Sequence, residues 1–174
     1  MIELPHAGVS RRIALASLAS LAAAALPLRA ADDDPAAAVR QAIVAYEKAW
    51  NSHDVKAWSR FLAEDVWYTE ADDTWYQRFK GRDKVVGWFE YSVKNGELQW
   101  KVDRIKVRPD GIVAAVVDQR VSMLPVKDGK YASVFDSKPS LVRWRREPDG
   151  QWRIVFFTSH KGWALAEIKK DGLE

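Results

Sequence analysis

Three Asp-Gly pairs, which divide residues 98–160 into four long segments, constrain the fold of this chain more than any other feature. The pairs are Asp110-Gly111, Asp128-Gly129 and Asp149-Gly150, and each interrupts a run of apolar or alternating residues. Asp-Gly is a favoured hairpin turn because glycine adopts positive φ angles without steric cost. Strands of about 10 to 16 residues are longer than usual and must twist and bend to stay packed. The pattern therefore predicts a four-stranded antiparallel meander with a concave face.

Two interruptions within these long segments predict local irregularities. The apolar residues change from one parity to the other near Asp103, which indicates a β-bulge. Pro139 has no backbone N–H to donate, so it predicts a bend or an edge in the third strand. The second segment, residues 112–124, is apolar at most positions, which predicts a central strand that is covered on both faces.

The first part of the chain predicts helices that cover the concave face. Asp34-Pro35 is a typical helix start, and Asp54 and Asp83 are suitable caps for two further helices. Residues 66–70 and 75–79 have the alternation and the β-branched or aromatic content of two short strands. Apolar residues at spacings of three and four form the buried stripe of the first helix, namely Val39, Ile43, Tyr46 and Trp50.

Residues 1–30 have the composition of an export signal. Arg11 and Arg12 precede an Ala- and Leu-rich run, residues 13–28, which is too short for a comfortable membrane span and is followed by a passable cleavage site. The arginine pair also resembles a twin-arginine motif, with Ala14 where an aromatic residue is usual. We expect a cleaved bacterial leader and a periplasmic or secreted protein; the alternative is an uncleaved membrane anchor.

The remaining chain is expected to form one nearly neutral domain at residues 36–165, between a linker at 31–35 and a tail at 166–174. The leader holds three of the 27 basic residues and one of the 24 acidic residues, so the rest is almost balanced. Such a domain gives no electrostatic reason to expect nucleic acid as a partner, or stable membrane insertion after cleavage. The lack of cysteine excludes disulfides, thiolate nucleophiles and zinc-thiolate sites.

The order helix, helix, two short strands, helix and bent meander resembles the superfamily named for nuclear transport factor 2, which includes SnoaL-like proteins and ketosteroid isomerases. The resemblance covers residues 36–160 and implies an α+β, cone-shaped fold. In this fold, three N-terminal helices pack on a strongly curved, mostly antiparallel sheet, as in a cystatin-like roll. The motifs that carry the resemblance are Trp50-Asn51-Ser52-His53-Asp54, Asp65-Val66, Gly81-Arg82-Asp83-Lys84-Val85 and Trp152-Arg153-Ile154-Val155.

The resemblance to ketosteroid isomerases implies two catalytic residues, Tyr46 and Glu70. Tyr46 lies eight residues before Asp54 and Glu70 lies sixteen residues after it, as the tyrosine and the general base do in those enzymes. In these roles Glu70 moves a carbon-bound proton while Tyr46 donates to the oxygen that gains charge, so we expect Glu70 to face the cavity with a raised pKa. The chain departs from the isomerases at Val142, where their second oxyanion donor falls. The alternatives are a core tyrosine and a surface carboxylate.

Other residues are candidates to line a ligand pocket. All nine tryptophans lie between Trp50 and Trp163, and large aromatic side chains fill cores but also line sites for flat apolar ligands. Opposite charges on the central strand should contact each other or a polar group in the cavity. The expected lining residues are Trp50, Tyr68, Trp88, Asp118, Arg120, Phe156 and His160. No histidine pair has metal-ligand spacing, so no metal and no other cofactor is expected.

These observations predict an exported pocket protein that binds a small, largely apolar molecule, with isomerase- or cyclase-like acid-base chemistry on a carbonyl compound as its candidate activity. The alternative is a non-catalytic binding or dimerisation domain of the same fold, because this superfamily hosts several functions. We also expect a homodimer through the outer face of the meander. The proteins that this chain resembles commonly pair there, and the central strand is apolar on both faces.

Overall fold

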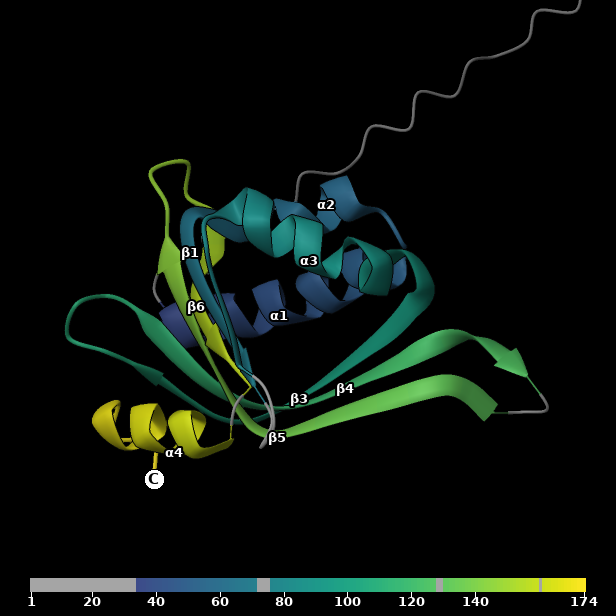
Figure 1. Cartoon of the computed structure of the whole chain (residues 1–174). Helices are drawn as coiled ribbons and strands as arrows, with labels where there is room; N and C mark the ends of the chain where they lie inside the picture. The colour runs from purple at the N-terminus through teal and green to yellow at the C-terminus, as the bar shows by residue number, and fades with distance from the viewer. Residues whose placement is uncertain (1–33, 72–75, 128–129, 160) are drawn as a thin grey trace, which may run out of the picture.

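The computed structural model describes residues 34–71, 76–127, 130–159 and 161–174, without the side chains of residues 70, 71, 76, 125–127, 130–132 and 161. Helices α1, α2 and α3 lie on the concave side of one bent sheet, and α4 lies on the other side (Figure 1). The elements in chain order are α1 Pro35–Asn51, α2 Val55–Ser59, β1 Leu62–Ala71, β2 Tyr76–Lys80, α3 Arg82–Asn95, β3 Gly96–Val107, β4 Val113–Lys127, β5 Lys130–Arg146, β6 Trp152–Thr158 and α4 Lys161–Lys170.

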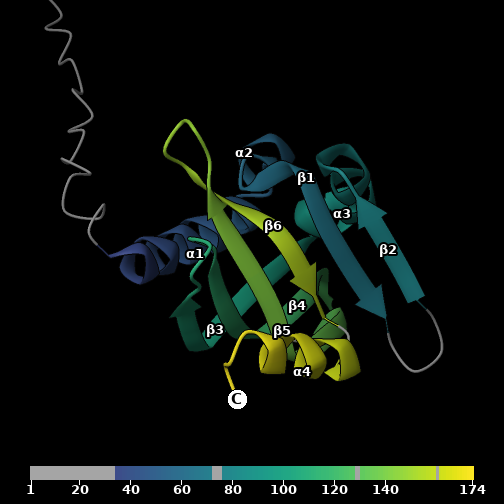
Figure 2. The same ribbon diagram turned by 90° about the vertical axis from the view of Figure 1, so that its left-hand side faces the viewer.

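The six strands form one sheet in the order β2-β1-β6-β5-β4-β3. Strands β3 to β6 are the predicted antiparallel meander, and β1 and β2 form an antiparallel hairpin. A parallel pairing joins β1 to β6, so it places the hairpin beside the last strand of the meander (Figure 2). The predicted α+β architecture, with three N-terminal helices on a strongly curved and mostly antiparallel sheet, is therefore confirmed.

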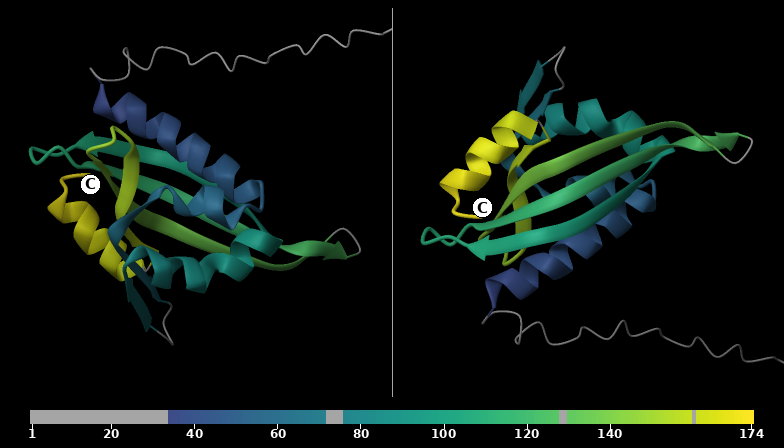
Figure 3. Two further views of the ribbon diagram at one scale, coloured as in Figure 1. Left: turned by 90° about the horizontal axis from the view of Figure 1, so that it is seen from above. Right: turned by 90° about the horizontal axis from the view of Figure 1, so that it is seen from below.

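Turns and bulges give the long strands their curvature. Gly111 and Gly150 both have φ of 79°, which the two Asp-Gly turns require. The third pair, Asp128-Gly129, lies outside the described residues. The predicted bulge at Asp103 is confirmed, because the β3–β4 ladder shifts between Val102 and Arg104. The ends of β4 and β5 that pair at Lys127 and Lys130 reach past the helices (Figure 3).

Pro139 also marks an irregularity in β5, as expected. Ser137 pairs with Gln119 and Ser140 pairs with Val117, so two residues of β5 lie opposite one residue of β4. Such a bulge bends the strand and increases its local twist, because the extra residue does not fit the regular ladder.

Side chains at the end of α1 fix this helix to the edge strand β3. The indole Nε1 of Trp50 donates to the carbonyl of Gly96 at 3.2 Å. The amide of Asn51 donates to the carbonyl of Leu98 at 2.9 Å and accepts from the N–H of Leu98 at 2.7 Å. These contacts satisfy backbone groups that an edge strand otherwise leaves open, and they place the stripe of α1 over the sheet.

The C-terminal helix α4 covers part of the outer face of the sheet. The expected boundary at residue 165 falls inside this helix, so residues 166–174 belong largely to the domain and are not a separate tail. Residues 166–174 belong to the domain because α4 and the residues after it form a small apolar cluster with the outer face of the sheet. Its buried members are Ala114, Val116, Leu141, Ala164, Ile168 and Leu173.

Two predictions concern the N-terminal part of the chain. The expected leader, residues 1–30, lies outside the described residues, so its cleavage and the export of the protein stay predictions. Among the helices that the structure describes, none has the length and apolar character needed to cross a membrane.

Candidate functional site

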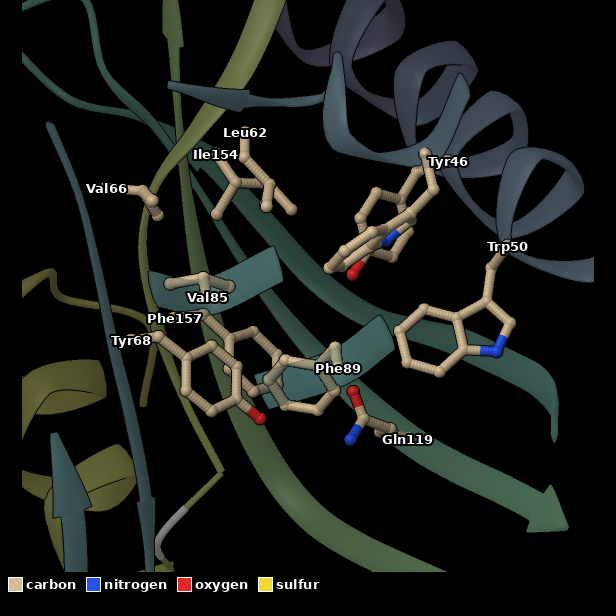
Figure 4. A pocket seen from close by; sticks show the side chains of 11 residues that line it. Tyr46, Trp50, Leu62, Val66, Tyr68, Val85, Phe89, Gln119, Ile154 and Phe157 are labelled. Carbon is tan, nitrogen blue, oxygen red and sulfur yellow. The ribbon is translucent and has the colours of Figure 1, made fainter. Parts of the chain in front are cut away.

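A pocket lies between the concave face of the sheet and the three N-terminal helices. Its lining side chains are mostly aromatic or aliphatic, namely Tyr46, Trp50, Trp58, Leu62, Val66, Tyr68, Val85, Phe89, Gln119, Ile154 and Phe157 (Figure 4). The cavity volume among them is only about 20 Å³, which is room for about one water molecule. A larger ligand therefore requires some of these side chains to move.

Tyr46 lies among four aromatic side chains, namely Trp58, Phe61, Trp100 and Trp144. Its ring stacks on Trp100 with 4.5 Å between the centroids, and it meets the ring of Trp144 edge-on at 6.2 Å. Burial raises the pKa of the Tyr46 hydroxyl well above its usual value. The nearby indole N–H of Trp58 opposes this shift only partly, because the effect of burial is larger. The hydroxyl therefore stays protonated and can donate a hydrogen bond at any physiological pH.

Gln119 on β4 supplies a second polar group to the pocket. The indole Nε1 of Trp100 donates to its Oε1 at 2.8 Å. Because an indole nitrogen can only donate, this contact identifies the oxygen of the amide and leaves Nε2 as the free donor. No described residue accepts a hydrogen bond from Nε2. Figure 4 shows the hydroxyl of Tyr46 and the amide of Gln119 directed toward the same interior space.

Two buried indole N–H groups beside Tyr46 have no acceptor among the residues that the structure describes. They belong to Trp58, which is 1 % exposed and lines the pocket, and to Trp144, which is fully buried. A buried donor without an acceptor costs about 1–3 kcal/mol, so it calls for a physical reason. Together with the hydroxyl of Tyr46 and the amide of Gln119, the pocket presents groups that can donate to a ligand oxygen.

Three of the predicted site residues line this pocket, namely Tyr46, Trp50 and Tyr68. The backbone of Glu70 pairs with Gln77 of β2. The side chain of Glu70 lies outside the description, and so does His160. The expected contact between Glu70 and Tyr46, and the raised pKa of Glu70, therefore stay predictions.

The structure places Asp118 and Arg120 on the outer face of the sheet, away from the pocket. They share this face with Val116, whereas the odd-numbered residues of β4 face the helices. Arg120 lies 3.8 Å from Asp136, so its charge has a partner outside the cavity. The polar residue that β4 presents to the pocket is Gln119, which has the parity of the buried apolar positions. The sequence did not indicate Gln119, because the opposite charges of Asp118 and Arg120 were the more unusual feature of this strand.

Trp88 and Phe156 also lie outside the pocket. Trp88 is 43 % exposed on α3 and packs against Phe79, with 5.1 Å between the ring centroids. In β6 the pairing with β5 skips Val155, so Ile154 and Phe156 do not lie on the same face of the sheet. This bulge turns Phe157 toward the pocket, and Phe156 packs with the outer cluster instead.

The described part of the chain holds no group of three His, Asp or Glu side chains that could bind a metal ion. The polar groups of the pocket are neutral donors, which suit hydrogen bonding to an oxygen atom. The chemistry that this arrangement supports is therefore the binding and polarisation of a carbonyl or similar acceptor.

The model of the SnoaL-like domain family matches residues 43–157, and no curated protein matches. An NTF2-like protein of unknown function from Shewanella oneidensis is 17 % identical with a TM-score of 0.56, over 73 % of this chain and 99 % of that one.

Two further solved structures show the same fold. A ketosteroid isomerase-like protein from Erwinia carotovora is 14 % identical with a TM-score of 0.56, over 74 % of this chain and 96 % of that chain. A domain with a cystatin-like fold from Nostoc punctiforme is 17 % identical with a TM-score of 0.55, over 77 % and 85 %. At these identities the structures establish the fold alone, whereas the family model covers most of the domain. The chain therefore belongs to the SnoaL-like domain family, and it shares the fold of NTF2-like proteins.

Proposed function

We propose that the interior pocket binds a small, largely apolar molecule through an acceptor oxygen such as a carbonyl. The observation that carries this proposal is that the indole N–H of Trp58 and the Nε2 of Gln119 have no acceptor among the described residues and lie in the same pocket as the hydroxyl of Tyr46. The other lining groups are mostly apolar, so the rest of the ligand must be apolar as well. A ligand oxygen would satisfy donors that the fold leaves unpaired.

Binding requires the pocket to open, and Phe89 on α3 is the proposed moving group. Its ring meets Tyr68, Trp50 and Trp58 edge-on, with centroids 4.7, 5.9 and 6.2 Å away. A phenyl ring has no hydrogen bond to break, so a rotation of Phe89 costs only packing contacts. Such a rotation would enlarge the pocket without disturbing the donors.

For catalysis, Glu70 is the proposed proton acceptor. From the alternation of β1 we expect its side chain on the face that carries Val66 and Tyr68, both of which line the pocket. A carboxylate there would take a proton from the carbon next to the carbonyl. The donors on Tyr46 and Gln119 would stabilise the charge that develops on the oxygen. The fold shared with a ketosteroid isomerase-like protein supports this chemistry.

Calorimetry with 1-tetralone and its hydrocarbon counterpart tetralin tests the binding proposal. The wild-type protein should bind the ketone more tightly than tetralin. The substitutions Tyr46→Phe and Gln119→Leu should each weaken ketone binding about three- to tenfold, the loss expected for one hydrogen bond. Tyr91→Phe is the matched control, because Tyr91 is 68 % exposed on α3. Equal affinity for the two compounds would contradict the proposal.

Deuterium exchange tests the acid-base step separately. The protons of 1-tetralone next to its carbonyl should exchange faster in D₂O when the protein is present, as NMR can measure. Glu70→Gln should abolish this acceleration and preserve binding. If the variant exchanges the protons as fast as the wild type, Glu70 is not the base, although the binding proposal would stand.

A non-catalytic assembly domain is the second candidate, and one surface favours it. Val134 and Phe135 on β5 are 39 % and 61 % exposed, which is unusual for adjacent apolar residues on one strand. The apolar residues that motivated pairing on the outer face are instead covered within the chain by α4. A stable dimer by light scattering that Phe135→Ser disrupts, with no response to 1-tetralone, would favour assembly.

We also propose that the protein is exported, as residues 1–30 indicate. The test is mass spectrometry of the protein from a bacterial host after fractionation. A chain that begins near Ala31 or Asp32 outside the cytoplasm is expected. An intact leader on a cytoplasmic form would contradict export.

A further inference from the structure

A second hollow lies on the outside of the molecule, between α1, α2 and the beginning of β6. Its volume is about 580 Å³, within the range of small-molecule sites and far larger than the interior pocket. Phe61 and Trp152 provide its large apolar surfaces, and alanine methyl groups from both helices extend them. This groove is therefore an open, apolar-floored site that the interior pocket does not include.

The charged side chains that line this groove are all cations, namely Lys48, Arg60 and Arg153. Arg153 is paired, since its Nη atoms lie 2.6 and 2.9 Å from the carboxylate of Asp149. Lys48 and Arg60 form no ion pair with any residue that the structure describes. Two unpaired cations at the edge of an apolar groove give it a net positive charge.

A different charged hollow has no such excess of unpaired cations. It lies near the beginning of β1, and its lining mixes both signs of charge. Arg82 there pairs with Glu64 at 2.5 Å, and Arg145 pairs with Asp65 at 2.8 Å. Its cations are neutralised within the chain, whereas those of the groove are open to an external anion.

We propose that this groove binds a small amphipathic anion, such as a medium-chain carboxylate. The apolar part of the ligand would lie on Phe61 and Trp152, and its carboxylate would contact Lys48 and Arg60. The dimensions of the groove, the apolar floor and the excess of cations together determine this class of ligand. The groove is distinct from the interior pocket. Phe61 lines the groove and Tyr46 lines the pocket, and their rings meet edge-on with 5.9 Å between the centroids.

Calorimetry with octanoate and its uncharged counterpart 1-octanol tests the proposal on the full-length protein. One octanoate should bind per chain, more tightly than 1-octanol and more weakly as salt increases. The double variant Lys48→Gln/Arg60→Gln should lose about tenfold in octanoate affinity, as expected for two solvent-exposed charge contacts. The control Arg40→Gln/Lys56→Gln removes the same charge from α1 and α2 outside the groove and should leave affinity unchanged.

The NMR signal of the Trp152 indole N–H locates the bound octanoate, with Trp152→Phe as the assignment control. Octanoate should shift this signal, and Gln119→Leu, a change in the interior pocket, should leave the shift intact. Equal losses of affinity in both double variants would overturn the proposal, because they would show only a general charge effect. Octanoate binding that 1-tetralone displaces, or no binding at all, would overturn it as well.

Discussion

The two faces of the same sheet differ in how well their polar groups are satisfied. On the concave face, the indole N–H groups of Trp58 and Trp144 are buried without an acceptor. On the outer face, the side chain of Asp171 is 2 % exposed but accepts from Arg108 at 2.7 Å and from Arg143 at 2.8 Å. Arg143 also reaches Glu167 at 2.6 Å, so this network joins α4 to the sheet.

This difference indicates how the sheet divides stability and function. A network with its charges paired on the outer face holds α4 in place. Donors that remain unpaired on the concave face cost free energy in the absence of a ligand. Natural proteins tolerate such costs mainly at functional sites, which is why the concave face is the better candidate for binding.

The largest expected effect is on the concave face. Phe89→Ala should lower the free energy of unfolding by about 3–5 kcal/mol, because it deletes a buried ring at the centre of the aromatic cluster. Urea denaturation measures this change, with Tyr91→Ala on the exposed side of α3 as the control. The enlarged cavity should also admit 1-tetralone more readily. Weaker binding by a variant that is still folded would contradict the role of Phe89 in opening the pocket.

Breaking the outer network should have the next largest effect. Asp171→Ala leaves Arg108 and Arg143 without their shared carboxylate, and we expect a loss of about 3 kcal/mol in unfolding free energy. Asp110→Ala is the control, because Asp110 also contacts Arg108 but is 47 % exposed, so its loss should stay below about 1 kcal/mol. Binding of 1-tetralone should be unaffected. A changed affinity would show that the two faces are coupled.

Acid should weaken the outer face through Glu167. Burial alone would raise the pKa of this carboxyl, but hydrogen bonds from Lys170 and Arg143 outweigh it and hold the pKa below its usual value. The stabilisation is therefore complete above the unfolded pKa of about 4.3 and is lost as the pH falls through the lower folded value. Stability measured from pH 7 to 2 should fall less steeply in Glu167→Gln. Identical pH profiles would exclude this contribution.

The smallest effect concerns Thr158, an unpaired buried group that is not on the concave face. The hydroxyl of Thr158 on β6 is fully buried and has no hydrogen-bond partner within the described part of the chain. Thr158→Val removes this unpaired group and keeps the shape of the side chain, so stability should rise by about 1 kcal/mol. Thr158→Ala, which also removes volume, should not stabilise the protein. Destabilisation by the valine variant would show that the hydroxyl is satisfied in solution, for example by water.

Much of the fold followed from local patterns. The Asp-Gly turns at Gly111 and Gly150 and the bulge at Asp103 are where the sequence predicts them. The stripe of α1 is also correct, since Tyr46 and Trp50 are both buried and line the pocket. Each of these features depends on residues that are close in sequence, so spacing alone is enough to predict it.

The side of the sheet on which a residue lies was harder to predict. Alternation correctly indicated which residues of β4 share a face, but not which face meets the helices, so Asp118 was expected where Gln119 lies. In β6 a single skipped residue, Val155, exchanged the roles of Phe156 and Phe157. A period of two makes every such assignment sensitive to a shift of one residue.

The sequence by itself determined the order of the first three helices and the six strands, the turns of the meander and the membership of the SnoaL-like family. Only the tertiary structure decided which donors meet in the pocket and that α4 belongs to the domain. The physical reason is distance along the chain. Local spacing controls backbone conformation, whereas the contacts of Tyr46 with Trp100 and of Arg143 with Asp171 exist only after the sheet has curved and brought distant residues together.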